Sequence, residues 1–264
     1  MRPITGITKE KVILTENNIP REIVSLIKDE RPASVAILLD KSSLVSQQKR
    51  TLTANWFAQF IAGSNPSNEY ILIGYDTAPE TMCDWGCDAM NLLDALRSGP
   101  TTTAKRKTAL YDACLFALDK MNGRTNSKRV LLIFSDGLDN GSKASYGQLR
   151  SVLKQSSALL YEIAIISDAE RLTWKRTTAD YVMELASVTS GMEMQTLPSA
   201  GAMENTANLF SGVLRNQYVL SFKLTGEADH KLHPITIKFA GRVPEATALT
   251  PEIYLRIRPE FYDQ

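Results

Sequence analysis

The chain has 264 residues, of which 44% are hydrophobic and 22% charged, an ordinary globular composition that fits one large domain or a large domain with a small partner. Lys and Arg number 30 against 29 Asp and Glu, so the formal net charge is +1, and no overall field favours nucleic acid or an anionic membrane. No window is long and apolar enough to span a membrane, and the N-terminal MRPITGITKE lacks the apolar core of a signal peptide.

The first expected elements are strands. The segment KVILTENNIPREIVSLI predicts two short strands around a turn at residues 17–20. A fourth buried strand is predicted at Tyr70–Tyr75, followed by a turn at residues 76–79 and a short edge segment near Met82. Three further segments each contain a nearly unbroken apolar run, which predicts a strand buried on both faces. These segments are Val35–Leu39, Val130–Phe134 and Leu159–Ile166.

The segments between these strands carry apolar residues at helical spacing. The stripes are Leu52, Trp56 and Phe60; Leu110, Cys114 and Leu118; Val182 and Ala186; and Phe210 and Leu214 in a segment that begins near Ala202. Buried strands that alternate with amphipathic helices predict an α/β fold with a mostly parallel sheet and helices on both faces. On this pattern Trp56 and Cys114 are core residues.

After Asn216 the hydrophobic period changes to alternation, which favours antiparallel strands with one face in water. The alternating apolar residues are Ile235, Ile237 and Phe239, and then Ile253, Leu255 and Ile257. Neither end of the chain has enough apolar surface to form a stable sheet alone, so the two ends are expected to build one small antiparallel β module. The predicted organisation is an N-terminal β segment at 1–31, an α/β domain at 32–215 and a C-terminal β segment at 216–264.

Oxygen-bearing side chains follow two of the predicted buried strands. Asp40 and Ser42 follow the first, Asp136 follows the strand that ends at Phe134, and Thr108 begins a helix between them in sequence. Ligands of open parallel sheets bind at the carboxyl ends of the strands, so these four side chains are expected over one edge of the sheet. Carboxylate and hydroxyl oxygens suit a hard cation such as Mg²⁺, Mn²⁺ or Ca²⁺.

At these residues the sequence resembles the von Willebrand factor type A family. The metal-ion-dependent adhesion site of that family contains Asp-x-Ser-x-Ser, a distant Thr, and a distant Asp that is usually followed by Gly. The matching stretches are DKSSL at 40–44, KTALYDA with Thr108, and FSDGLDN with Asp136 and Gly137. The likeness extends to an acidobacterial branch that carries a β stretch ahead of the domain and a β tail such as NQYVLSF to LRIRPEFY, so it covers nearly the whole chain.

The resemblance implies a Rossmann-like, doubly wound sheet and a metal site formed by Asp40, Ser42, Thr108 and Asp136. The second Ser of the family motif is Leu44 here, so one hydroxyl that is expected to contact the metal is absent. Lys41 and the run Lys105–Lys107 add positive charge nearby, which should also weaken cation binding. The sequence therefore predicts a site that is partly degenerate.

Simpler interpretations remain open for several of these residues. Strand-end acids can bind backbone amides in turns, and Thr108 can be a helix N-cap as well as a metal ligand. Cys83 and Cys87 can close a small disulfide or be two separate thiols, and the three cysteines of the chain lack the paired spacing of a zinc site.

The resemblance implies a non-enzymatic, adhesion-type binding module that presents a divalent cation to an acidic side chain of a protein partner. It also implies a bacterial protein that is secreted or periplasmic. One alternative is a metal-independent structural module of a secreted or periplasmic assembly. Another is a metal-assisted phosphoryl-transfer enzyme, although no Gly-rich phosphate loop, G-x-S-x-G elbow or nucleophile with a nearby His supports it. Neither the partner nor the oligomeric state follows from the sequence.

Overall fold

The computed structural model describes residues 6–41, 46–98, 107–135, 139–165, 179–223 and 235–240. The chain divides into two compact units. One unit, which we call the α/β unit, contains Arg31–Ser211, and the other, which we call the β module, combines Met1–Glu30 with Gly212–Gln264. Among the described residues, no helix has both the length and the apolar character needed to cross a lipid bilayer.

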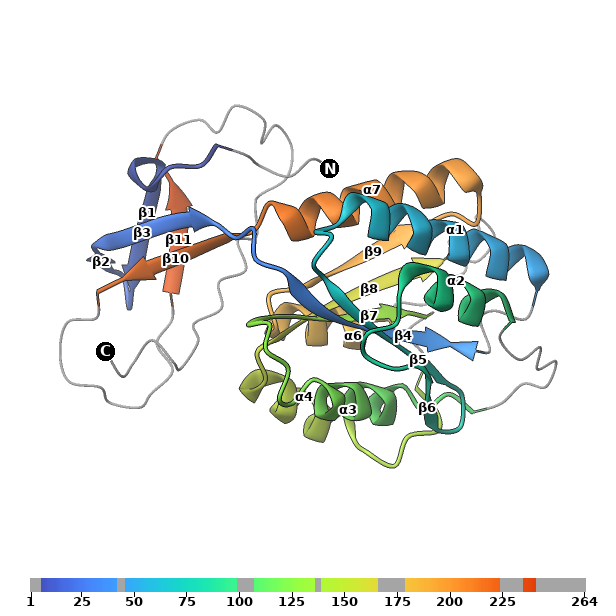
Figure 1. The fold of residues 1–264 in the computed structure, drawn as a ribbon. Helices are drawn as coiled ribbons and strands as arrows, with labels where there is room; N and C mark the ends of the chain where they lie inside the picture. Colours follow the sequence, from blue (N-terminus) through green and yellow to red (C-terminus); the bar gives the residue numbers. More distant parts are fainter. Residues whose placement is uncertain are drawn as a thin grey trace. The chain divides into compact units, whose positions relative to one another are not determined.

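A six-stranded sheet forms the centre of the α/β unit, in the order β6-β5-β4-β7-β8-β9 (Figure 1). Its strands are β4 (Ala33–Asp40), β5 (Glu69–Tyr75), β6 (Pro79–Cys83), β7 (Lys128–Phe134), β8 (Ala158–Ile165) and β9 (Met192–Thr196). Only the edge strand β6 is antiparallel to its neighbour. All eight residues of β4 are buried, because helices cover both faces of the sheet.

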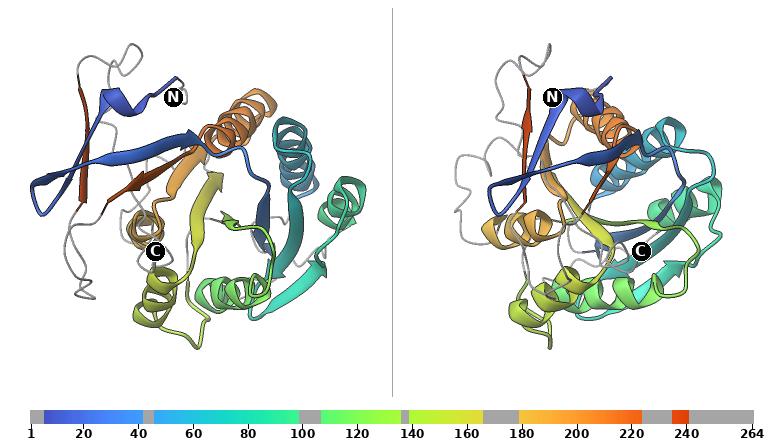
Figure 2. Two further views of the ribbon diagram at one scale, coloured as in Figure 1. Left: turned by 60° about the vertical axis from the view of Figure 1, so that its left-hand side comes forward. Right: turned by 90° about the vertical axis from the view of Figure 1, so that its left-hand side faces the viewer.

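The α-helices that the described residues form around this sheet are α1 (Gln47–Gly63), α2 (Ala89–Ser98), α3 (Leu110–Lys120), α4 (Tyr146–Gln155), α6 (Ala179–Val188) and α7 (Ala200–Arg215). Helices α1 and α7 lie on one face, and α3 and α4 lie on the other (Figures 1 and 2). The doubly wound, mostly parallel fold expected from the sequence is therefore confirmed. The apolar stripes did not identify α2 and α4, and the strand β9 was not expected.

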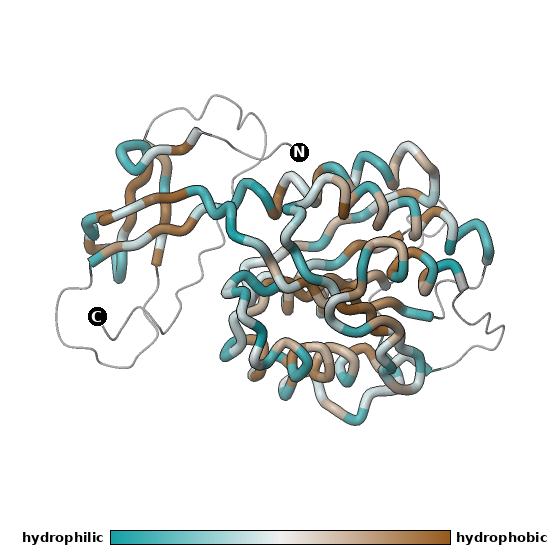
Figure 3. The backbone as a smooth tube through the Cα atoms, viewed as in Figure 1, coloured by the Kyte–Doolittle hydropathy of each residue, from teal (hydrophilic) through white to brown (hydrophobic). Residues whose placement is uncertain are grey.

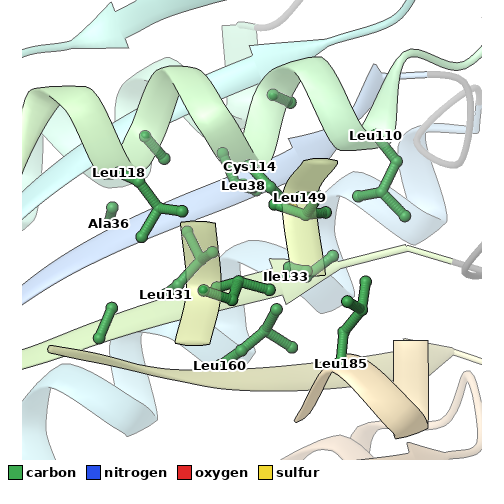
Figure 4. Packing of buried hydrophobic residues seen from close by; sticks show 14 of the residues in the cluster. Ala36, Leu38, Leu110, Cys114, Leu118, Leu131, Ile133, Leu149, Leu160 and Leu185 are labelled. Atoms are coloured by element: carbon green, nitrogen blue, oxygen red, sulfur yellow. The ribbon is translucent and has the colours of Figure 1, made fainter. Parts of the chain in front are cut away.

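The two faces of the sheet carry different cores. On the α3 side, alternate strand residues such as Leu38, Ile133 and Leu160 pack against Cys114 and its neighbours (Figure 4). On the α1 side the core is aromatic, and Trp56 lies fully buried among Phe57, Phe60, Phe134 and Phe210. Hydrophobic residues concentrate in the central strands, while turns and outer helix faces are more hydrophilic (Figure 3). Trp56 and Cys114 are core residues, as predicted.

Both ends of the chain contribute strands to the β module, which confirms the small antiparallel element. Its elements are the short 3-10 helix η1 (Lys9–Lys11) and the strands β1 (Val12–Glu16), β2 (Ile19–Arg21), β3 (Ile23–Lys28), β10 (Tyr218–Phe222) and β11 (Ile235–Phe239). β1 lies between β11 and β2 in one sheet, and β10 pairs with β3 in another. The strand expected at 253–257 lies outside the described residues.

The first hairpin is tighter than expected. Asn17 and Asn18 have positive φ angles of 50° and 64°, which suits a two-residue turn in which both central residues are left-handed. The predicted turn at 17–20 was therefore too long, because Pro20 already lies in β2, opposite Thr15. Proline is tolerated there since β2 is an edge strand and its missing N–H breaks no inner ladder.

Candidate functional site

The carboxyl ends of β4, β5, β7 and β8 lie at one edge of the sheet because these strands are parallel. Asp40 is the last residue of β4, and its side chain is nearly inaccessible, with 1% exposed. Its register partner on β5 is Tyr75, so both side chains leave the same face of the sheet. Ser42 and Asp136, which were also expected here, lie outside the described residues.

Thr108 is held against the same edge by backbone contacts from two sides. Its amide donates to Asn140 Oδ1 at 2.8 Å, and its carbonyl accepts from the amides of Asn140 and Gly141 at 3.0 Å each. The next amide, that of Ala109, donates to the carbonyl of Asp76 at the end of β5 at 2.6 Å. Thr108 therefore joins the end of β5 to the loop that follows β7, and its side chain is buried with it.

This arrangement explains two features of the sequence. A Cβ atom at position 141 would lie 2.9 Å from the Cβ of Lys107, so glycine permits the close approach of the two loops. The N-cap residue of α3 is Ala109, which makes no side-chain capping bond. The N-cap interpretation of Thr108 is therefore wrong.

Two acids, Asp139 and Asp112, hold the described part of the loop after β7 in position. Asp139 Oδ1 accepts hydrogen bonds from Ser142 Oγ at 2.5 Å and from the Tyr111 amide at 3.3 Å. Asp112 of α3 accepts from the amides of Lys143 and Ala144 at 2.9 Å each. These acids therefore fix residues 139–144 of the loop against the start of α3.

The Lys41 side chain extends toward the β5–β6 hairpin. Its Nζ lies 2.8 Å from Glu80 Oε1 and 3.8 Å from Asp76 Oδ2, and 9% of its side chain is exposed. A Cβ at Gly74 would lie 3.3 Å from Lys41 Cδ, so glycine leaves room for the lysine chain to cross β5. Two acids therefore compensate the positive charge of Lys41.

The described part of the predicted donor set fits a hard divalent cation. Asp40 supplies a carboxylate and Thr108 a hydroxyl, and both are buried at one edge of the sheet. Among the described residues, no group of three or more His, Cys, Asp or Glu side chains is arranged to hold a metal. A complete coordination shell thus depends on Ser42, Asp136 and water in addition to the two described donors.

Cys83 and Cys87 form a disulfide with a Cα–Cα distance of 5.8 Å. Cys83 lies opposite Leu72, at the end of β6 away from Tyr75 and the candidate site. Between the cysteines, Trp85 donates from Nε1 to the carbonyl of Lys120 at 2.9 Å. The structure thus selects the disulfide from the two interpretations that the sequence left open.

Comparison with protein families gives a match over part of the chain. Residues 35–138 match the model of the von Willebrand factor type A domain. No curated protein matches the chain.

Solved structures share the fold at low sequence identity. The PilB minor pilin from Streptococcus sanguinis is 8% identical with a TM-score of 0.54, and the match covers 72% of this chain and 62% of the pilin. Proximal thread matrix protein 1 from the mussel byssus, with a zinc-occupied MIDAS motif, is 12% identical with a TM-score of 0.57. The match covers 75% of this chain and 49% of the mussel protein. BatB from Bacteroides thetaiotaomicron is 13% identical with a TM-score of 0.52, and the match covers 70% of this chain and 100% of BatB. The chain thus spans less than two thirds of the pilin and of the mussel protein.

Proposed function

Because residues 35–138 place the α/β unit in the von Willebrand factor type A family, we propose that this protein is a non-enzymatic module that binds another protein through a divalent cation. The observation that carries the proposal is the position of Asp40, a buried carboxylate at the carboxyl end of the central strand β4. Thr108 is fixed at the same edge by the end of β5 and by the loop after β7.

The proposed ligands of the cation are Asp40, Ser42, Thr108 and Asp136. A cation bound to them supplies a Lewis acid whose remaining positions accept water or a carboxylate from the partner. Leu44 removes one hydroxyl from the family pattern, and water can take its place. The pairing of Lys41 with Glu80 and Asp76 supports the proposal because it lowers the repulsion that a cation would meet.

A secreted or periplasmic location is part of the same proposal. Disulfides persist mainly in oxidising compartments, and the Cys83–Cys87 bond agrees with such a location. The PilB minor pilin and a relative described as an aerotolerance-related membrane protein from Bacteroides fragilis share the fold. Their low identity makes them support for the fold, while the location rests on the disulfide and on the resemblance of the whole chain.

Thermal unfolding with titrated cation tests the proposal. After treatment with a chelator, addition of Mg²⁺, Mn²⁺ or Ca²⁺ is expected to raise the Tm of the wild-type protein progressively, because the cation binds only the folded state. At one hundred times the Kd the stabilisation is about 2.7 kcal/mol. Asp136→Ala removes a proposed ligand and should show no such rise. Leu44→Ser restores the missing hydroxyl and should respond at lower cation concentration.

The matched control is Asp94→Ala, which removes an exposed acid that pairs with Arg97 on α2. This variant should respond to the cation as the wild type does. A rise in Tm that survives in Asp136→Ala would contradict the proposed site. A response seen only in Leu44→Ser would show that this chain has lost its metal, and the binding function would then belong to a metal-independent surface.

A further inference from the structure

One asparagine holds the backbone of a proposed cation ligand at two points. Asn140 Oδ1 accepts a hydrogen bond from the Thr108 amide at 2.8 Å, and the Asn140 amide donates to the Thr108 carbonyl at 3.0 Å. The next amide, that of Gly141, donates to the same carbonyl at 3.0 Å. Asn140 and Thr108 are 32 positions apart in the sequence, so these bonds fix Thr108 relative to the described part of the loop after β7.

Thr108 depends on such contacts because it precedes the helix that follows it. The N-cap of α3 is Ala109, so the helix itself does not fix the amide of Thr108. The Ala109 amide donates to the Asp76 carbonyl, which anchors the chain just after Thr108. Thr108 is buried, with 5% of the residue exposed, and its amide uses the Asn140 side chain as acceptor. A buried amide that loses its acceptor is costly, so without this oxygen the Thr108 backbone is expected to shift.

The backbone of Thr108 determines where its hydroxyl can lie. Threonine is branched at Cβ and has few χ1 rotamers, so a fixed backbone leaves its hydroxyl oxygen few positions. With Leu44 in place of the second serine of the family motif, Ser42 and Thr108 are the two hydroxyl ligands in the proposed set. The precision of the coordination at Thr108 therefore depends on Asn140.

We propose that Asn140 is a positioning residue of the cation site, which shifts the selectivity of the site toward Mg²⁺ and away from Ca²⁺. This inference rests on the proposed function. Mg²⁺ requires nearly octahedral oxygen ligands at about 2.0–2.1 Å, whereas Ca²⁺ accepts oxygens at about 2.3–2.6 Å in flexible arrangements. A hydroxyl held in one place suits the smaller cation, and a hydroxyl that shifts penalises Mg²⁺ more than Ca²⁺. Groups that orient a metal ligand commonly contribute about tenfold or more to affinity.

Asn140→Ala should change the ratio of two dissociation constants. The Kd for Mg²⁺ is expected to rise about tenfold, while the Kd for Ca²⁺ stays within about threefold of the wild-type value. Asn140 is an exposed residue, so alanine removes little packing, and the backbone bonds to the Thr108 carbonyl remain. A residue that only stabilises the fold would lower the Tm of the cation-free protein and change both Kd values by the same factor.

Asn140→Asp is the conservative variant, because it keeps an oxygen that accepts from the Thr108 amide. Its added charge strengthens the binding of both divalent cations, so the ratio of the two Kd values should stay within about twofold of the wild-type ratio. Should Asn140→Ala not fold, Asn140→Leu keeps the approximate size of asparagine without its oxygen and carries the same expectation as alanine.

Asn122→Ala is the matched control. Asn122 is exposed and is followed by glycine, as Asn140 is, but it lies in the turn after the end of α3. Both of its Kd values should stay within about twofold of the wild-type values. The full chain is freed of metal with a chelator, and the Kd values for Mg²⁺ and Ca²⁺ are taken from the rise of Tm with concentration.

The outcomes separate the two proposals. If the wild type responds to the cations and Asn140→Ala keeps the wild-type Kd ratio, this inference is overturned and the proposed function stands. The same holds if Asn140→Asp or Asn122→Ala changes the ratio as much as Asn140→Ala does. If neither the wild type nor Leu44→Ser responds to either cation, the proposed cation site fails, and the role of Asn140 fails with it. A selective loss of Mg²⁺ affinity in Asn140→Ala that is absent from Asn140→Asp supports both.

Discussion

Replacing Gly191 with alanine is expected to prevent folding of the α/β unit or to destabilise it by more than about 4 kcal/mol. A Cβ at this position would lie 1.6 Å from the carbonyl oxygen of Leu160 and 2.6 Å from its carbonyl carbon. These atoms belong to the backbone of β8, which is paired on both sides and has no room to shift. The amide of Gly191 also caps α6 by donating to the carbonyl of Ala186 at 2.9 Å.

Gly147→Ala provides the comparison. Gly147 lies in α4, and the nearest atom to a Cβ there is Ser145 Oγ at 4.0 Å. Alanine restricts the unfolded chain and favours helix, so this variant should be as stable as the wild type or more stable by about 0.5–1 kcal/mol. Urea unfolding followed by circular dichroism measures both changes. A Gly191→Ala midpoint equal to that of the wild type would contradict the close packing of the β8 backbone against the start of β9.

The second large effect is expected for Trp56→Ala, with a loss of about 3–5 kcal/mol in the free energy of unfolding. Trp56 is fully buried on α1, and its ring centroid lies 4.7 Å from that of Phe134 on β7 and 5.8 Å from that of Phe210 on α7. Its removal leaves a cavity where a helix, the central sheet and a second helix meet. These neighbours cannot all move inward, because each is fixed by its own backbone hydrogen bonds.

Trp85→Ala tests whether the effect depends on burial rather than on residue type. Trp85 is only partly buried, and the Arg124 guanidinium lies 4.8 Å from its ring centroid. Its truncation loses this contact and the bond to the Lys120 carbonyl, and should cost less than Trp56→Ala. Equilibrium unfolding in guanidinium chloride compares the two. Equal losses would show that the aromatic core on the α1 side is less tightly packed than its ring distances indicate.

The fold could be predicted from the sequence wherever one local pattern determined an element. The apolar runs Val35–Leu39 and Val130–Phe134 lie within β4 and β7. They could be predicted because a strand buried on both faces is apolar along nearly its whole length. β9 was missed because Met192–Thr196 is a short edge strand in which only two methionines alternate with polar residues. α4 carried its own signal, a capping box formed by Ser145 and Gln148, which the apolar stripes did not reveal.

The candidate site also has some residues that the sequence predicts and some contacts that only the folded structure reveals. The end of a buried strand predicts the position of Asp40, and the order of the motifs predicts Thr108 at the same edge of the sheet. The sequence does not predict that Lys41 pairs with Glu80 or that Thr108 donates a hydrogen bond to Asn140. Both contacts join segments that meet only in the folded chain.

The pairing of the two chain ends in the β module has a consequence for biosynthesis. Leu14 on β1 pairs with Ile237 on β11, and Leu26 on β3 pairs with Leu220 on β10. A ribosome releases the N-terminal strands long before their partners are made, whereas the α/β unit is a continuous stretch that can fold as it emerges. The β module is therefore completed only after the α/β unit has been made. Until β10 and β11 are made, β1 and β3 each have an edge without its partner strand, and such edges are prone to pair with other chains.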